Sequence, residues 1–132
     1  ISIASTDDLN KYRIGAIKDD SAVQMLRDRG VKEGDLRLES TSKLIIDMLQ
    51  NGSIDAWAYG DTAGIWLIQE SGANASDFEV AYVLEQADYY YAFNKATPDS
   101  LVRSFQEAID YLKSNEDKDG MSDYAKILYK IY

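Results

Sequence analysis

The sequence predicts an α/β fold with a mostly parallel sheet. Short apolar, β-prone segments alternate with helical segments through residues 12–83. The first three helical segments each end at a glycine, the residue that most readily takes the left-handed conformation after a helix. Because parallel neighbours need a crossover connection, regular strand–helix alternation is typical of a parallel sheet with right-handed crossovers.

Three strand–helix repeats are expected in the first half of the chain. Apolar runs and alternating patterns mark the strands, and capping residues mark the helix starts. In chain order the predicted elements are a strand at 12–17, a helix at 21–29, a strand at 36–39, a helix between the caps at 40–42 and Gly52, a strand at 54–59 and a helix at 62–71. The other two glycine stops are Gly30 and Gly72.

The regular strand–helix alternation ends near residues 84–88. A fourth strand is expected at 78–83, and a fifth at 89–93, where three tyrosines, an alanine and a phenylalanine follow one another. After residue 88, one strand and two helices no longer continue the alternation.

Two helices are expected at the carboxy-terminal end. Pro98 in the first turn starts a long helix, and its apolar stripe consists of Leu101, Val102, Phe105, Ile109 and Leu112. A polar turn at 115–120 leads to a last helix at 124–132. The residues expected to be buried in that helix are Ile127, Leu128 and Ile131.

Composition excludes several functional classes. The chain has 132 residues, the size of one domain, and 45% of them are hydrophobic. A net charge of −9 disfavours nucleic acid and anionic membranes as partners. The absence of cysteine and histidine removes disulfides, thiolate chemistry and the commonest general base. No apolar run is long enough to span a membrane. The start at Ile1 instead of methionine suggests an excised piece.

Five short motifs follow one another along the chain. They are Asp8-Leu9 with Tyr12-Arg13-Ile14-Gly15, Ile17-Lys18 with Ser21 at a helix start, Leu49 to Ala56 before Gly60-Asp61, Tyr90 to Lys95 before a proline-started helix, and Asp119 to Leu128. In this order they resemble the second half of the extracellular solute-binding proteins of family 3, which have the type II periplasmic binding-protein fold. The resemblance implies a three-layer αβα lobe with a mostly parallel sheet, followed by a carboxy-terminal strand and two helices.

The resemblance also implies how the chain divides. Residues 1–11 would be the first hinge crossing and the turn after it, 12–84 the second lobe, 85–88 the return hinge, and 89–132 the closing part of the first lobe. The family's amino-terminal half, with the arginine that usually grips a ligand carboxylate, would be missing. We therefore expect the chain to dimerise, to exchange segments or to keep a companion fragment.

The turn after the first strand is a candidate ligand site. Free N–H groups and the dipole at a helix start favour an anion. By the resemblance, Ser21 matches a hydroxyl that holds a ligand carboxylate in amino-acid binders, and Lys18 matches a lysine present in some members. Asp20 departs from the family's small residue and would repel a carboxylate. Its alternative role is the N-cap of the helix.

A second candidate lies where the third strand ends. Asp61 follows that strand at the edge where ligands collect in open α/β sheets. The resemblance matches it to the acidic residue that pairs with a ligand ammonium group, and a capping role is compatible with this. Tyr59, with Trp57 on the same face, either stacks on a ligand or belongs to the core. Thr41, at the neighbouring strand-to-helix turn, is a cap or a ligand contact.

The sequence thus predicts a solute-binding module that is not an enzyme and holds no cofactor. The resemblance implies a small polar solute, such as an amino acid, bound between two lobes. It further implies an extracellular or periplasmic, membrane-tethered protein that serves the permease of an ABC-type importer or a sensor. An acidic cleft slightly favours a cationic or polyhydroxylated solute.

Two alternatives remain open. One is an enzyme of related two-lobe architecture, such as a dehydratase. The other is a non-binding interaction domain whose strand at 89–93 pairs with another chain. Asn115, Asp117, Asp119 and Gly120 imitate the start of a calcium loop, but Lys126 stands where that loop needs a glutamate, so we expect a turn.

Overall fold

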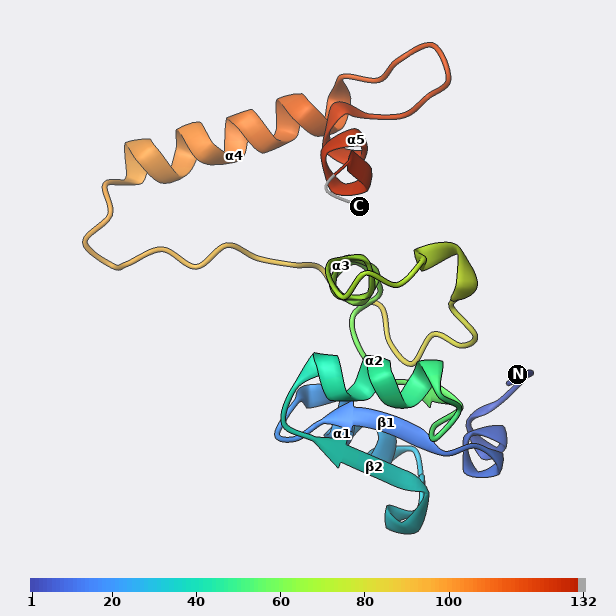
Figure 1. Cartoon of the computed structure of the whole chain (residues 1–132). Coiled ribbons are helices and arrows are strands. Elements are labelled where there is room, and N and C mark those ends of the chain that lie inside the picture. The colour runs from blue at the N-terminus through green and yellow to red at the C-terminus, as the bar shows by residue number, and fades with distance from the viewer. Residues whose placement is uncertain (131–132) are drawn as a thin grey trace. The chain divides into compact units, whose positions relative to one another are not determined.

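The computed structural model describes residues 1–130, with the side chains of residues 129 and 130 left undescribed (Figure 1). The chain forms two compact units, Ile1–Gln86 and Ala87–Tyr132. The first unit is a mixed α/β structure around a small parallel sheet, and the second is helical. Within residues 1–130, no helix is both long and apolar enough to cross a membrane.

The sheet of the first unit has three parallel strands, β1 (Ile14–Ile17), β2 (Leu36–Glu39) and β3 (Ala56–Trp57). Their order is β2-β1-β3, so β1 is central. β1 lies in register with both neighbours, as Ile14 faces Leu36 on one side and Ala56 on the other. The first three predicted strands are confirmed, and the parallel sheet with them. β3 is shorter than the predicted strand at 54–59, because its other edge has no partner within the described residues.

One helix follows each strand, namely α1 (Ser21–Asp28), α2 (Ser42–Gln50) and α3 (Asp61–Glu70). They confirm the three predicted helices. Each is followed by the expected glycine with a positive φ, at Gly30, Gly52 and Gly72. Short 3-10 helices add η1 (Thr6–Lys11), η2 (Glu33–Asp35) and η3 (Ala75–Asp77).

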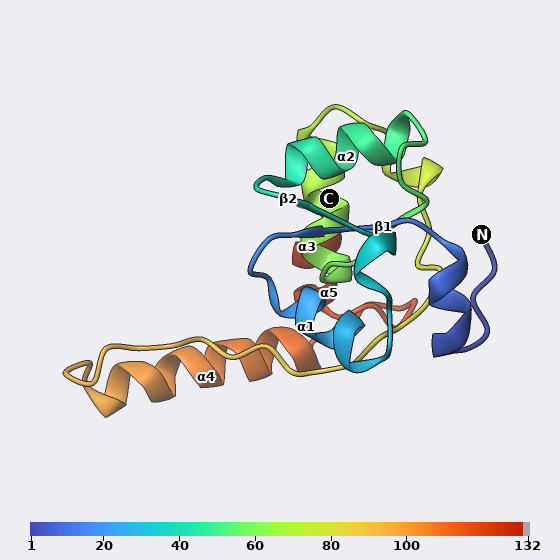
Figure 2. The ribbon, with the colours of Figure 1, turned by 90° about the horizontal axis from the view of Figure 1, so that it is seen from below.

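Helices α1 and α2 lie on opposite faces of the sheet (Figures 1 and 2). On the α1 face, Ile14 packs in a buried cluster whose other members are Leu9, Ala22, Leu26, Val31, Leu36 and Ala58. The next residue of β1, Gly15, points to the α2 face because side chains alternate along a strand. A Cβ at Gly15 would lie 2.5 Å from Ile54 Cδ1 and 3.1 Å from Ile45 Cδ1, so glycine lets α2 approach the sheet closely.

The predictions of strands at 78–83 and 89–93 are wrong for this structure. Both segments lack regular secondary structure, and no backbone–backbone hydrogen bond involves residues 79–93. Residues 80–84 instead pack in an irregular conformation within the first unit, where Tyr82 and Leu84 lie against the α1-face cluster. Arg29 Nη2 donates to the carbonyl oxygen of Leu84 at 2.6 Å. A β-prone segment becomes a strand only where a neighbouring strand can form hydrogen bonds with its backbone.

The second unit consists of an extended segment, α4 (Asp99–Ser114) and α5 (Asp123–Lys130). The proline-started helix is confirmed, and so is the last helix over its described part. None of the residues 87–128 is buried. The expected burial of Ile127 is therefore wrong, since its side chain is 44% exposed. Leu128 is half-buried, and Ile131 lies outside the described residues.

Candidate functional site

The three strand-to-helix turns of the first unit open at one edge of the sheet. Because β1, β2 and β3 are parallel and in register, their carboxyl ends share that edge. Lys18 N–H donates to the carbonyl oxygen of Glu39 at 2.8 Å, and Ala58 N–H donates to that of Gly15 at 2.9 Å. The starts of α1, α2 and α3 follow directly. The parallel sheet therefore brings all six predicted site residues to turns at the edge formed by the carboxyl ends of the strands.

The turn between β1 and α1 carries Lys18, Asp20 and Ser21. Asp20 is the N-cap of α1, because its carboxylate accepts a hydrogen bond from Ala22 N–H at 2.8 Å. The alternative role of Asp20 is therefore the one observed. Lys18 and Ser21 have exposed side chains. Asp19 between them has φ 65°, and within residues 1–130 it is the one non-glycine residue with a positive φ. This left-handed residue costs backbone energy, on the order of 1 kcal/mol, at the edge of the candidate site.

The turn between β2 and α2 carries Thr41. It is the N-cap of α2, and its hydroxyl accepts a long hydrogen bond of 3.4 Å from Leu44 N–H. Its side chain is exposed. The capping role predicted for Thr41 is confirmed.

The turn between β3 and α3 carries Tyr59 and Asp61. The rings of Trp57 and Tyr59 stack with centroids 4.7 Å apart and planes 14° apart, as expected for alternate residues on one face. Both rings lie over Gly64 of α3, where a Cβ would meet them at ordinary contact distance. Asp61 is exposed and occupies the first position of α3, and its carboxylate accepts from Thr62 N–H at 2.6 Å. Gly60, and not Asp61, is the N-cap.

A cavity of about 520 Å³ lies along β3 within the first unit. Two of the six predicted residues line it, Tyr59 and Asp61. The other four, Lys18, Asp20, Ser21 and Thr41, do not, so the cavity and the candidate edge overlap only at the end of β3.

The cavity wall is mostly aliphatic, and it also carries acidic and aromatic residues. Its carboxylates are Asp55, Asp61, Asp77 and Glu79, and its aromatic side chains are Trp57, Tyr59, Phe78 and Tyr82. Among the described residues, no lysine or arginine lines it. Trp57 Nε1 is buried without a hydrogen-bond acceptor in the described part of the chain. This wall suits a ligand with a positive charge and a nonpolar surface.

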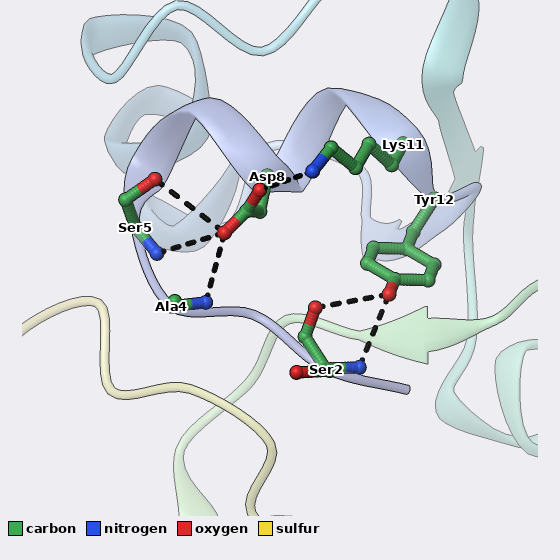
Figure 3. A network of polar contacts seen from close by, with 6 residues as sticks. All are labelled: Ser2, Ala4, Ser5, Asp8, Lys11 and Tyr12. Carbon is green, nitrogen blue, oxygen red and sulfur yellow. Dashed lines mark hydrogen bonds and ion pairs between the residues drawn. The ribbon is translucent and has the colours of Figure 1, made fainter.

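A network of polar contacts holds the amino-terminal segment (Figure 3). Two residues of this segment, Ile1 and Ile3, line the cavity. The Asp8 carboxylate accepts from Lys11 Nζ at 2.5 Å and from Ala4 N–H at 2.9 Å. The Lys11 hydrogen bond, with these backbone donors, lowers the pKa of Asp8 to about 2. Tyr12 Oη accepts from the N–H of Ser2 at 3.1 Å and donates to its carbonyl oxygen at 3.0 Å.

Sequence reasoning missed one ion pair at the opposite end of the strands. Arg13 precedes β1 and Asp55 precedes β3, and their fork-like contact joins Nη2 to Oδ1 at 2.7 Å and Nε to Oδ2 at 3.0 Å. Arg13 Nη2 also donates to the carbonyl oxygen of Gly52 at 2.9 Å. The hydrogen bonds from Arg13 hold the pKa of Asp55 below its ordinary value. The missed signal is two opposite charges that each stand just before adjacent parallel strands.

The calcium-like segment is a turn closed by a side-chain cation, which confirms the predicted turn. Lys126 Nζ lies 3.1 Å from an Asp117 oxygen and 3.0 Å from an Asp123 oxygen. The Asp117 carboxylate also accepts from the N–H groups of Asp119 and Met121, each at 3.0 Å. Within residues 1–130, no group of three or more acidic side chains is arranged to hold a metal ion.

Comparison with known proteins gives no relative. No protein-family model, no curated protein and no solved structure matches the chain. The likeness to the family 3 solute-binding proteins therefore stays a prediction from the sequence motifs.

Proposed function

We propose that the first unit is the solute-binding part of a non-catalytic binding protein. The observation that carries the proposal is the end of β3, where Tyr59 and Asp61 belong both to the shared edge of the sheet and to the cavity. Ligands of open α/β sheets collect at this edge. The left-handed Asp19 at the neighbouring turn adds support, because backbone strain clusters at ligand sites.

The solute that fits this site is small and carries an amine. Asp61 is exposed and its second carboxylate oxygen has no partner within the described residues, so it can accept from an ammonium group. Aromatic faces attract cations, and the cavity wall carries four aromatic side chains without a competing lysine or arginine among the described residues. Amino acids and cationic solutes are the corresponding ligand classes.

The wider biological setting follows from the sequence motifs alone. By their resemblance, the chain would supply half of a two-lobe site of the type II periplasmic fold. It would work outside the cytoplasm, tethered to a membrane, and would present its solute to an ABC-type permease or a sensor. Ligand binding would then close the two lobes.

Thermal unfolding with a ligand panel tests the proposal. The panel contains lysine, glutamate, spermidine, choline and glucose, each added to the whole chain. A ligand at a hundred times its Kd stabilises by about 2.7 kcal/mol, which raises the Tm of a unit of this size by about 10 °C or more. We expect such a rise with an amine-bearing compound and none with glucose.

Two matched variants locate the binding. Asp61→Asn removes the exposed carboxylate of the site and should weaken amine binding by about tenfold or more, because a hydrogen bond between charged groups contributes about 1.5–3 kcal/mol. Asp7→Asn removes the same charge from an exposed residue whose side chain makes no hydrogen bond or ion pair in the described part, and should leave binding unchanged. Unaltered melting curves for every compound, or equal effects of the two variants, would contradict the proposal.

A further inference from the structure

The second unit carries a large uncovered aromatic surface. Tyr89, Tyr90 and Tyr91 are 79%, 87% and 61% exposed. Helix α4 has an apolar stripe but no buried residue, and Leu101 on that stripe is 57% exposed. Apolar patches of this kind mark interaction sites.

The backbone beside this surface is also unsatisfied. Within the described residues, no N–H or C=O group of residues 87–93 takes part in a hydrogen bond. The segment is composed of strongly β-prone residues, and such an open edge is a template for pairing with another strand.

One face of the segment 87–93 packs against α4. The Phe105 ring lies 5.0 Å from the Tyr91 ring and 5.5 Å from the Phe93 ring, in both cases edge to face. Contacts from residues two apart to one ring are those of an extended chain, in which alternate side chains share a face. Tyr91 and Phe93 therefore face the helix, Tyr89 continues their alternating series, and Tyr90 and Ala92 belong to the opposite face.

We propose that residues 88–94 of two copies of the chain pair as antiparallel strands around a two-fold axis at Tyr91. In that register Tyr91 faces its own copy, Tyr89 faces Phe93 and Tyr90 faces Ala92. Directly opposed residues of an antiparallel pair share a face, so both copies of α4 lie on the same side of the new ribbon. A shift by one residue would move one helix to the other side and separate the two aromatic faces.

Charge favours a second copy in this orientation. Asp88 comes to lie opposite Asn94, whose amide group can donate to the carboxylate, and Lys95 lies opposite Ala87. Parallel pairing in register would instead set Asp88 against Asp88 and Lys95 against Lys95, and like charges directly opposed destabilise a strand pair. The segment is thus self-complementary only when its two copies run in opposite directions.

The exposed aromatic side chains supply about two thirds of the area of a small specific interface. At about 200 Å² for each aromatic side chain, the exposed parts of Tyr89, Tyr91, Phe93 and Phe105 amount to on the order of 400 Å². Leu101 and the strand backbone add to this. Stable interfaces start at about 600 Å² for each partner. This inference does not depend on the solute site of the first unit.

Cysteine cross-linking of the whole chain tests the register, since the chain has no cysteine of its own. Tyr91→Cys should form a disulfide-linked dimer under mild oxidation, because opposed residues in an antiparallel pair have Cα atoms about 4.5–5.5 Å apart. Tyr89→Cys alone should not cross-link, but its mixture with Phe93→Cys should. Tyr111→Cys, at a tyrosine of α4 that is 65% exposed, is the control and should not form the disulfide-linked dimer.

Charge reversal tests the pairing without oxidation. By light scattering after size exclusion, the wild-type chain should be dimeric, and both Tyr91→Lys and Tyr91→Glu should be monomeric because like charges meet at the axis. Mixing these two variants should restore a dimer. A wild-type monomer at every concentration, failure of Tyr91→Cys to cross-link, or a dimer that persists in Tyr91→Lys would each overturn the proposal.

Discussion

The two units differ in whether their apolar patterns become a core. In the first unit, α1 and α2 place apolar stripes on a sheet, and Leu26, Ile45 and Ile46 are at most 1% exposed. In the second unit, α4 has an equally clear stripe, yet no residue among 87–128 is buried. The difference is the layer opposite the stripe, because an amphipathic helix is buried only against another layer.

The largest expected effect is a difference in stability loss between a mutation in the α2 stripe and one in the α4 stripe. Ile45→Ala empties a position that is 0% exposed and should lower the free energy of unfolding of the first unit by about 2–5 kcal/mol. In dilute solution, where the chain is monomeric, Leu101→Ala on α4 should change the stability by no more than about 0.5 kcal/mol, because its side chain is 57% exposed. Urea unfolding by tryptophan fluorescence measures the first effect, since Trp57 and Trp66 both lie in the first unit. Far-UV circular dichroism follows the second.

Equal losses from the two substitutions would contradict this comparison. In that case α4 would have a buried partner in solution. Repeating the measurement at several protein concentrations shows whether this partner is a second copy of the chain or a part of the same chain. A loss caused by a dissociating dimer grows with dilution.

The elements of the first unit could be predicted because local signals and pairing agree there. Capping residues such as Asp20 and Thr41 fix helix starts, and glycines fix helix ends. The segments 78–83 and 89–93 could not be assigned, because their β-propensity says nothing of whether a partner strand is within reach. In the same way, the stripe of α4 predicts a buried face but does not identify what covers it.

Hydrogen exchange extends the comparison to the backbone. Amides of β1 and of the α1 interior should exchange only on global opening of the first unit, because they are hydrogen-bonded over a buried cluster. Amides of residues 87–93 should exchange close to the rate of an unfolded peptide in dilute protein, since they have no acceptor in the described structure.

The concentration dependence of that exchange is informative. If two copies pair at Tyr91, alternate amides of residues 88–94 should gain protection as the concentration rises, because an antiparallel pair bonds every second residue to one neighbour. Uniform protection of 87–93 in dilute solution would contradict the absence of hydrogen bonds in this segment.

The candidate site was only partly predictable for a related reason. The shared edge of the sheet follows from the parallel strand–helix alternation, so the position of Tyr59 and Asp61 at that edge could be expected from the sequence. Phe78 to Tyr82 and Leu84 form part of the cavity wall, whereas the sequence pattern predicted a strand at 78–83. The Arg13–Asp55 pair requires β3 to lie beside β1, and this pairing is a property of topology and not of the local sequence.

Asp55 gives the first unit a specific pH dependence. Its pKa is lowered in the folded state by Arg13, so the unfolded chain binds the extra proton and stability rises with pH. The contribution is therefore full above the ordinary carboxyl pKa of 3.8 and is lost as the pH falls through the lower folded value. Asp55→Asn should be less stable than the wild-type chain near neutral pH, and the two should converge in acid. Urea midpoints measured by tryptophan fluorescence from pH 7 downward test this.

Asp35→Asn is the matched control for Asp55→Asn. The Asp35 carboxylate contacts no donor within the described residues, so its removal should leave the shape of the pH profile unchanged. A part of the acid dependence should persist in Asp55→Asn, since the pKa of Asp8 is also lowered, to about 2. Parallel profiles for Asp55→Asn and the wild-type chain would contradict the role assigned to the Arg13–Asp55 pair.

The smallest expected effect concerns the polar turn that joins α4 to α5. In place of an apolar core, this connection depends on Lys126 between the Asp117 and Asp123 carboxylates. Lys126→Gln removes both ion pairs and leaves two carboxylates that repel each other, so the amides of α5 should exchange several-fold faster. Lys118→Gln, at an exposed lysine without a partner in the described residues, should have no effect. Salt should reproduce part of the change in the wild-type chain, because about 1 M salt screens charges beyond roughly 3 Å. The tryptophan signal, which reports on the first unit, should stay constant in Lys126→Gln. Exchange in α5 no faster than in Lys118→Gln would contradict the role assigned to Lys126.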